Sequence, residues 1–117
     1  MVGFLTTHAL DTSCGTPAAN LRIDFVEHIH GRSNLLGSVS TNADGRTDRP
    51  IMTEVDFRLG SFELIFHVGD YYRQLGHRYS EPVFLDLVPI RFGISENKHY
   101  HVPLLLSPFG YSTYRGS

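Results

Sequence analysis

Hydrophobic and polar residues alternate with a period of two along much of this chain. In residues 20–28 the apolar positions are Leu21, Ile23 and Phe25, and in residues 61–68 they again fall on every second residue. Such alternation places one face of a strand against a core and the other face outward. The pattern therefore predicts a protein built mainly from half-buried β-strands.

Two further apolar runs contain a proline. Residues 82–92 include Pro89, and residues 99–106 include Pro103. Proline has no backbone N–H to donate to a neighbouring strand, so it is tolerated at sheet edges, bends and bulges. These runs are therefore predicted to be edge strands, or strands with a bend or a β-bulge at the proline.

Turn signals rich in Gly, Pro, Asn and Asp separate the runs, and Asp44-Gly45 is a strong hairpin signal. Short strands separated in this way predict an all-β fold, a two-sheet antiparallel β-sandwich formed by a single domain over residues 1–117. Residues 69–79 break the alternation. There, Asp70 as cap and Gly76 as terminator predict one short helix of about two turns.

Composition narrows the class of protein. The 117 residues carry a net charge of −2 with histidine neutral, which excludes a strongly basic nucleic-acid binder. No apolar run approaches the ~20 residues of a membrane-spanning helix, and no export signal is visible at the N-terminus. Cys14 is the single cysteine, so no intrachain disulfide can form. We therefore expect a cytoplasmic protein. The small polar neighbours of Cys14 give no sign of a reactive thiol.

Histidine is abundant, with seven in the chain, and His8 is the first candidate. If Leu5, Thr7 and Ala9 form the core face of the first strand, Thr6 and His8 point outward. A lone outward histidine is most often an ordinary surface residue. Whether His8 takes part in acid–base chemistry therefore depends on the side chains near it.

Arg46 follows the Asp-Gly turn. Its guanidinium is either exposed to solvent or binds an anion or a carbonyl oxygen.

His99 and His101 are two residues apart, so they share a face of a strand, and His28 and His30 have the same spacing. Two imidazoles could contribute to a metal site, but zinc normally needs three or four ligands. The His-x-His spacing alone is a weak metal signal.

The C-terminus ends in Tyr114-Arg115-Gly116-Ser117, preceded by Tyr111. Chain ends usually fray, yet tyrosines are amphipathic groups that favour a partly buried position with the hydroxyl free. A terminal carboxylate and a hydroxyl follow Arg115. This tail is therefore predicted to dock into a crevice, one that a second subunit could help to form.

Four motifs together resemble the transthyretin-like family and, within it, the 5-hydroxyisourate hydrolases. Residues 5–18, LTTHALDTSCGTPA, resemble the family's opening strand and turn, with Ala9 in place of the usual valine. DGR, GDYY and the closing YHVPLLLSPFGYSTYRGS match as well, so the resemblance spans the chain. The final Tyr-Arg-Gly-Ser is the specific mark that separates the hydrolases from the thyroid-hormone carriers of the same fold.

The resemblance implies a catalytic set and a substrate-binding set of residues. The histidine of the Tyr-His-Val-Pro motif is His101, and the motif passes over His99. The implied catalytic residues are His8, Arg46 and His101. Substrate binding is implied for His8, Arg46, Tyr114, Arg115, Gly116 and Ser117.

The resemblance also implies a homotetramer, a dimer of dimers, with substrate sites in the clefts where the dimers meet. The implied reaction is hydrolytic ring opening of the small molecule 5-hydroxyisourate, without a metal or another cofactor and with no nucleic acid or membrane as partner. His8 and His101 would share the acid–base roles in an order the residues leave open. Two alternatives remain at this point: a carrier of small aromatic ligands without catalysis, and a metal-binding β-sandwich that uses the His-x-His pairs.

Overall fold

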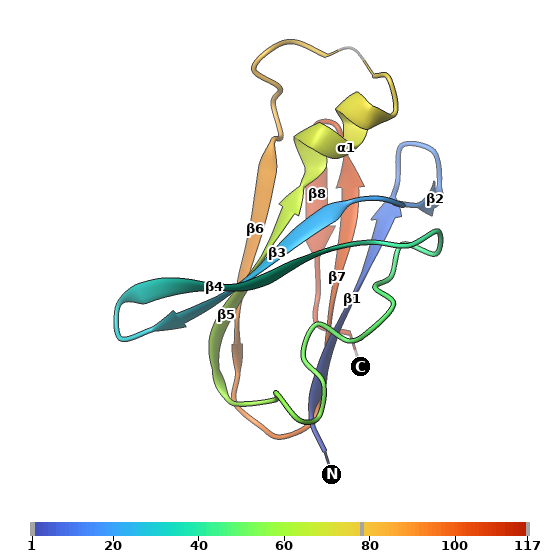
Figure 1. Cartoon of the computed structure of the whole chain (residues 1–117). Coiled ribbons are helices and arrows are strands. Elements are labelled where there is room, and N and C mark those ends of the chain that lie inside the picture. Colours follow the sequence, from blue (N-terminus) through green and yellow to red (C-terminus); the bar gives the residue numbers. More distant parts are fainter. Residues whose placement is uncertain (1, 78, 117) are drawn as a thin grey trace.

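The computed structural model describes residues 2–77 and 79–116, and in these residues eight strands and one short helix are found (Figure 1). This part of the chain forms two four-stranded sheets, with strand orders β2-β1-β7-β8 and β4-β3-β5-β6. The predicted two-sheet sandwich with one short helix is confirmed. The elements are β1 (Phe4–Asp11), β2 (Thr16–Pro17), β3 (Arg22–Ile29), β4 (Arg32–Ser40), β5 (Gly60–His67), α1 (Val68–Gln74), β6 (Leu87–Ile94), β7 (His99–Ser107) and β8 (Gly110–Thr113).

The hydrophobic core lies between the sheets and is formed by the residues that the period of two selects. Each residue predicted to face inward is at most 6% exposed, because a pleated strand sends alternate side chains to opposite faces. In β1 the same pattern buries Leu5, Thr7 and Ala9. The inward residues of β3 with the residue before it, and of the segment from β5 into α1, are Leu21, Ile23, Phe25, Phe62, Leu64, Phe66 and Val68.

The two prolines in the strand-like runs have different surroundings. Pro89 lies in β6, an edge strand of its sheet, as predicted. Pro103 instead lies inside β7, between β1 and β8. It is accommodated because the pairing of β7 with β8 begins one residue later, at Leu104. The Thr113 hydroxyl donates a hydrogen bond to the Pro103 carbonyl at 2.7 Å, which satisfies that acceptor.

Helix α1 begins earlier than the sequence predicted. The predicted cap, Asp70, lies inside its first turn, where its carboxylate accepts a hydrogen bond from Arg73 at 2.7 Å. The N-cap residue is His67, because β5 passes directly into the helix without a loop. The predicted terminator is confirmed, since Gly76 follows the helix with a φ of +82°. No helical segment in the described part of the chain is long and apolar enough to span a membrane.

A buried carboxylate joins this helix to β1. Asp11 is 1% exposed and accepts hydrogen bonds from the hydroxyls of Tyr71 and Tyr72, both at 2.9 Å. Burial raises the pKa of Asp11, but these bonds and those from Ser13 outweigh it and leave the pKa below its usual value. Burial, and then the bond to Asp11, raise the pKa of both tyrosines. The Gly-Asp-Tyr-Tyr motif is therefore an anchor of the fold.

Strands β1 and β7 run parallel, although most neighbouring strands of this sandwich are antiparallel. They lie side by side in Figure 1, with Thr6 paired to His101 and Phe4 paired to His99. Paired residues of neighbouring strands point to the same face of a sheet. The parallel register therefore brings the outward side chains of the first strand beside those of a strand about ninety residues later.

The long connection between β4 and β5, residues 41–59, packs along β1. The Leu5 N–H donates to the Met52 carbonyl at 2.9 Å, and the Ala9 N–H donates to the Gly45 carbonyl at 2.8 Å. These bonds attach an irregular segment to a regular strand at two points. The connection is thereby held beside the outward face of β1.

Candidate active site

The face of the β1–β7 pair that points away from the core carries a group of polar side chains. Thr6 and His8 come from β1, and His99 and His101 come from β7. All four are partly exposed, so the outward direction predicted for His8 is confirmed. The ring centroids of His99 and His101 are 6.2 Å apart. Two of the predicted residues, His8 and His101, thus belong to one face.

A tight turn brings Arg46 to this face. The turn predicted at Asp44-Gly45 is present, but it lies within the long connection and does not join two paired strands. The Asn42 side-chain oxygen accepts hydrogen bonds from the N–H groups of Asp44 at 2.9 Å and Arg46 at 3.2 Å. Asn42 was not among the residues predicted to shape the site. An asparagine two residues before an Asp-Gly pair is the available signal, because its side chain can imitate a backbone turn.

Glycine is required in this turn because the turn docks tightly against β1. Gly45 has a φ of +73°, and a Cβ at this position would lie 2.4 Å from the Ala9 carbonyl oxygen. The docked turn presents the Asp44 carbonyl to His8, whose Nε2 lies 3.1 Å from that oxygen. A carbonyl only accepts hydrogen bonds, so neutral His8 carries its proton on Nε2 and keeps a lone pair on Nδ1.

The surroundings of His101 lower its pKa. Burial lowers its pKa below 6.5, and the nearby charges of Arg46, His99 and His8 lower it further. Both causes disfavour the imidazolium. Its Nδ1 lies 2.8 Å from the Thr6 hydroxyl. His101 is therefore held as a neutral imidazole near pH 7, a state in which it can accept a proton.

A cavity of about 390 Å³ opens over this face. Arg46, His99 and His101 contribute to its wall, so the structure brings together the predicted arginine and one predicted histidine. His8 lies beside it, hydrogen-bonded to the turn that carries Arg46. Basic and hydroxyl groups outnumber the single acidic residue, Asp48, in the lining of this cavity, which suits a small polar or anionic ligand. Its lining is Thr6, Thr7, Arg46, Thr47, Asp48, Arg49, Pro50, His99 and His101.

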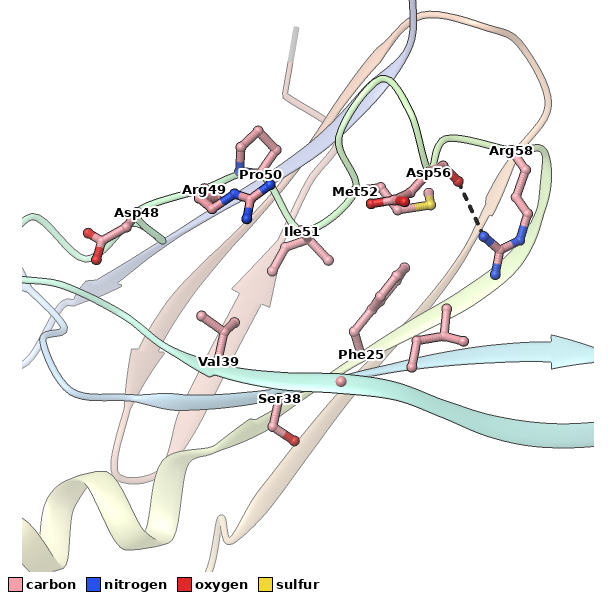
Figure 2. A pocket seen from close by; sticks show the side chains of 12 residues that line it. Phe25, Ser38, Val39, Asp48, Arg49, Pro50, Ile51, Met52, Asp56 and Arg58 are labelled. Carbon is pink, nitrogen blue, oxygen red and sulfur yellow. Dashed lines mark hydrogen bonds between the residues drawn. The ribbon is translucent and has the colours of Figure 1, made fainter.

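A second and larger cavity, of about 530 Å³, lies on the other side of the segment Asp48–Pro50. Figure 2 shows Phe25, Val39 and Ile51 pointing into it between β4 and the long connection. Charged side chains stand at its rim, where Arg58 donates a hydrogen bond to the Asp56 carbonyl at 3.2 Å. None of the predicted site residues that the structure describes lines this cavity. The smaller cavity is therefore the better candidate for chemistry.

The C-terminal tail extends along β7 as far as His101. The Gly116 N–H donates to the His101 carbonyl at 2.8 Å. Tyr114 is 59% exposed, and the Arg115 guanidinium lies 4.6 Å from the centre of the Tyr100 ring. Both line a different cavity, together with Tyr100. Ser117 lies outside the described residues. Of the described tail residues Tyr114, Arg115 and Gly116, Gly116 is thus the one that packs against the His101 side chain.

Three of the four histidines in the His-x-His pairs make side-chain hydrogen bonds in this structure. His99 and His101 share the hydroxyl of Thr6, and His28 bonds to Glu63 on the neighbouring strand β5 of its own sheet. In residues 2–77 and 79–116, no group of three or more His, Cys, Asp or Glu side chains could hold a metal ion.

Comparison with known proteins places these residues in a family context. The model of the HIUase/Transthyretin family matches residues 5–116. The protein called 5-hydroxyisourate hydrolase 2 from Rhizobium meliloti (strain 1021) is 54% identical over 116 residues, which covers 98% of this chain and 97% of that protein.

Three solved structures show the same fold. The 5-hydroxyisourate hydrolase of Klebsiella pneumoniae is 31% identical with a TM-score of 0.81, over 98% of this chain and 94% of that one. Sea bream transthyretin in complex with thyroxine is 26% identical with a TM-score of 0.85, over 96% and 93%. An (S)-allantoin synthase is 44% identical with a TM-score of 0.90, and the match covers 98% of this chain but 44% of that longer one.

Proposed function

The chain belongs to the HIUase/Transthyretin family, and on this premise we propose that it hydrolyses 5-hydroxyisourate, opening the ring by cleavage of a cyclic amide C–N bond. The observation that carries the proposal is the meeting of His101 and Arg46 at one cavity, with His8 beside it. Near-complete coverage by a relative that bears the hydrolase name supports it.

The reaction needs three chemical functions. Water must lose a proton as its oxygen bonds to the ring carbonyl carbon, the carbonyl oxygen must be stabilised as it becomes negative, and the leaving nitrogen must gain a proton when the C–N bond breaks. Histidines supply the proton transfers and a guanidinium supplies the charge, so this mechanism routes no step through a metal.

We assign the general base to His101. Its lowered pKa keeps it neutral, and its Nδ1 already bonds to Thr6, so Nε2 is the nitrogen that receives the proton of water. Arg46 stabilises the negative charge that develops on the carbonyl oxygen. His8, once protonated on Nδ1 as well as Nε2, donates a proton to the leaving nitrogen.

The C-terminal tail is proposed to hold the planar ring of the substrate and to exclude water. Its residues are Tyr114, Arg115, Gly116 and Ser117. Tail residues that do not reach this cavity within their own chain are proposed to reach the cavity of a neighbouring subunit.

A carrier without catalysis is the alternative. Against it, the cavity is lined by basic and polar side chains, which are costly to desolvate for simple apolar binding. The chain is 54% identical to a hydrolase but 26% identical to the thyroxine-bound transthyretin. Both observations favour the hydrolase.

The decay of freshly generated 5-hydroxyisourate tests the proposal. We expect the protein to accelerate the loss of its ultraviolet absorbance well beyond the spontaneous rate, and a strong chelator to leave that rate unchanged. Equal decay with and without protein would support the carrier. Loss of activity on chelation and recovery with zinc would show that a metal takes part.

Replacement of Gly116 by alanine should impair turnover by displacing His101. A Cβ at position 116 would lie 2.6 Å from His101 Cδ2 and 3.0 Å from its Cβ, so the ring must shift. A displacement of this size can lower kcat by about 10²-fold. The matched control is Gly110→Ala in β8, where the nearest atom to an added Cβ, Ser107 Oγ, is 3.8 Å away. Equal turnover by both variants would contradict the role of the close packing.

We also propose that the protein assembles as a homotetramer, a dimer of dimers. Strand β8 is a sheet edge, and such edges pair readily with a second chain. Three large side chains near this edge, Phe109, Tyr111 and Tyr114, are 66%, 46% and 59% exposed. Light scattering should give a mass close to four times that of one chain, and a monomer at micromolar concentration would contradict shared sites.

The proposed location is the cytoplasm. Cys14, the single cysteine of the chain, is an exposed free thiol, a state maintained in reducing compartments. Fractionation of cells that express the intact gene would test this, and recovery from an exported fraction would contradict it.

A further inference from the structure

One hydroxyl group stands between two imidazoles on the catalytic face. Thr6 Oγ1 lies 2.7 Å from His99 Nε2 and 2.8 Å from His101 Nδ1. A threonine hydroxyl has a single proton to donate and two lone pairs. When that proton goes to one ring, the other ring must donate its own N–H to the hydroxyl oxygen. The two rings are therefore not independent.

Backbone pairing and packing keep these three groups in place. Thr6 is paired with His101 across the β1–β7 ladder, and Phe4 is paired with His99. The Phe4 ring stacks on the His99 ring at a centroid distance of 4.0 Å and an interplanar angle of 8°. On the other side of β7, the Gly116 N–H donates a hydrogen bond to the His101 carbonyl. The contact belongs to the regular part of the sheet, which makes it a stable feature of the site.

The shared hydroxyl leaves two arrangements of protons for the neutral rings. If Thr6 donates to His101 Nδ1, His99 donates from Nε2, and both rings carry their proton on Nε2. If Thr6 donates to His99 Nε2, His101 donates from Nδ1, and both rings carry their proton on Nδ1. In each arrangement the two rings have the same tautomer. Only the second leaves the Nε2 lone pair of His101 available to a water molecule.

We infer that Thr6 and His99 are positioning residues that set the protonation of His101, with the Thr6 hydroxyl passing a proton between His101 Nδ1 and His99 Nε2. The inference deepens the proposed hydrolase function and rests on it for its catalytic meaning. It gives a role to His99, which the family motif passes over. His99 acts through another residue, so it need not contact the substrate.

The relay conserves protons and charge. His101 takes a proton from water on Nε2 and becomes an imidazolium. Its Nδ1 proton moves to Thr6 Oγ1 while the Thr6 proton moves to His99 Nε2. His101 is then neutral with its proton on Nε2, and the positive charge resides on His99. That transfer moves the charge away from His101, whose surroundings include the guanidinium of Arg46. Return of the two protons puts the charge back on His101, and loss of its Nε2 proton to the product or to solvent then restores the starting state.

The first test needs no turnover. Nitrogen-15 NMR of histidine-labelled protein, above the pH at which the rings are charged, reports the tautomer of each ring. We expect His99 and His101 to share the Nδ1–H tautomer in the unmodified protein and to lose this match in Thr6→Val, which keeps the shape but removes the hydroxyl. Different tautomers on the two rings of the unmodified protein would overturn the inference, because the hydroxyl would then not link them.

The second test is kinetic. Thr6→Val and His99→Gln should each lower kcat about 10–100-fold with little change in KM. This loss is smaller than that expected for removal of the general base itself, because His101 remains in place. Thr6→Ser keeps the hydroxyl and should retain most of the activity. The double variant should be no slower than the slower single variant, because both changes break one relay. Thr12→Val, which removes a hydroxyl bonded to the Leu106 carbonyl beyond the end of β1, is the control and should leave kcat unchanged.

A readout of proton number separates a relay from simple support of the fold. The rate plotted against the deuterium fraction of the solvent should curve for the unmodified protein and become linear for Thr6→Val. Unchanged kcat in Thr6→Val, in a protein that does hydrolyse 5-hydroxyisourate, would overturn the relay and leave the proposed function intact. Absence of hydrolysis by the unmodified protein would contradict the function, and the NMR comparison would still decide whether Thr6 couples the rings.

Discussion

Replacement of His101 by asparagine should lower kcat for 5-hydroxyisourate by about 10²–10⁴-fold, the usual contribution of a positioned general base. The fold should persist, because the side chain lies on the outward face of β7 and its carbonyl bond to the Gly116 N–H involves only backbone atoms. The asparagine amide can still bond to Thr6 but cannot take a proton at pH 7. Loss of turnover with an unchanged circular dichroism spectrum is the expected pair of results.

The pH dependence of the unmodified protein provides a second measure of the same residue. Burial, followed by the charges of Arg46, His99 and His8, lowers the pKa of His101, so its neutral form persists below pH 6.5. Activity that needs neutral His101 should therefore hold as the pH falls through 6.5 and decline at lower pH. An acidic limb of kcat/KM centred above pH 6.5 would contradict the assignment of the base.

His30→Asn is the matched control for this substitution. His30 is exposed in the turn between β3 and β4, where it has a φ of +52°. Asparagine tolerates that left-handed conformation well, so the control makes the same chemical change without strain. It should leave both kcat and stability unchanged. Similar losses in the two variants would mean that the His101 effect reflects general damage.

Among the substitutions predicted here, Asp11→Ala should cause the largest decrease in the free energy of unfolding. The carboxylate accepts the hydroxyl protons of Tyr71 and Tyr72 in a buried site, and alanine leaves both hydroxyls without this acceptor. Bonds to a charged group and the cost of unpaired buried donors together predict a decrease of about 3–5 kcal/mol in the free energy of unfolding. Urea denaturation followed by circular dichroism measures it, and a variant as stable as the parent would contradict the anchor.

Acid should remove the same contribution in the unmodified protein. Hydrogen bonds hold the pKa of Asp11 below 3.8 despite its burial. A carboxyl whose folded pKa is lowered contributes stability above its unfolded pKa, and this stability is lost as the pH falls through the folded value. The difference in stability between the parent and Asp11→Ala should therefore be full at neutral pH and shrink below pH 3.8. Asp11→Asn, which keeps one acceptor oxygen, should lie between them.

Local pattern was sufficient to predict much of the fold. The period of two identified the buried residues of β3 and β5, such as Ile23 and Leu64, because a pleated strand separates its two faces whatever its neighbour. For the same reason, buried Leu5 and Ala9 determine that His8 points outward. The local signal misled at Asp70, since a strand that continues directly into a helix leaves no place for a separate cap, and at Asp44-Gly45, whose turn does not join two paired strands.

What the sequence by itself determined is therefore which residues face the core, where the short helix ends, and which side chains are available for chemistry. Only the tertiary structure decided how these side chains meet. Thr6 and His99 are 93 residues apart, and no periodicity reveals that β1 pairs in parallel with β7. Likewise, contact alone shows that the Arg46 turn docks against β1 through Gly45 and that Gly116 leaves room for His101. The physical reason is that the period along a strand depends on its own backbone, whereas its partner and register depend on packing across the whole chain.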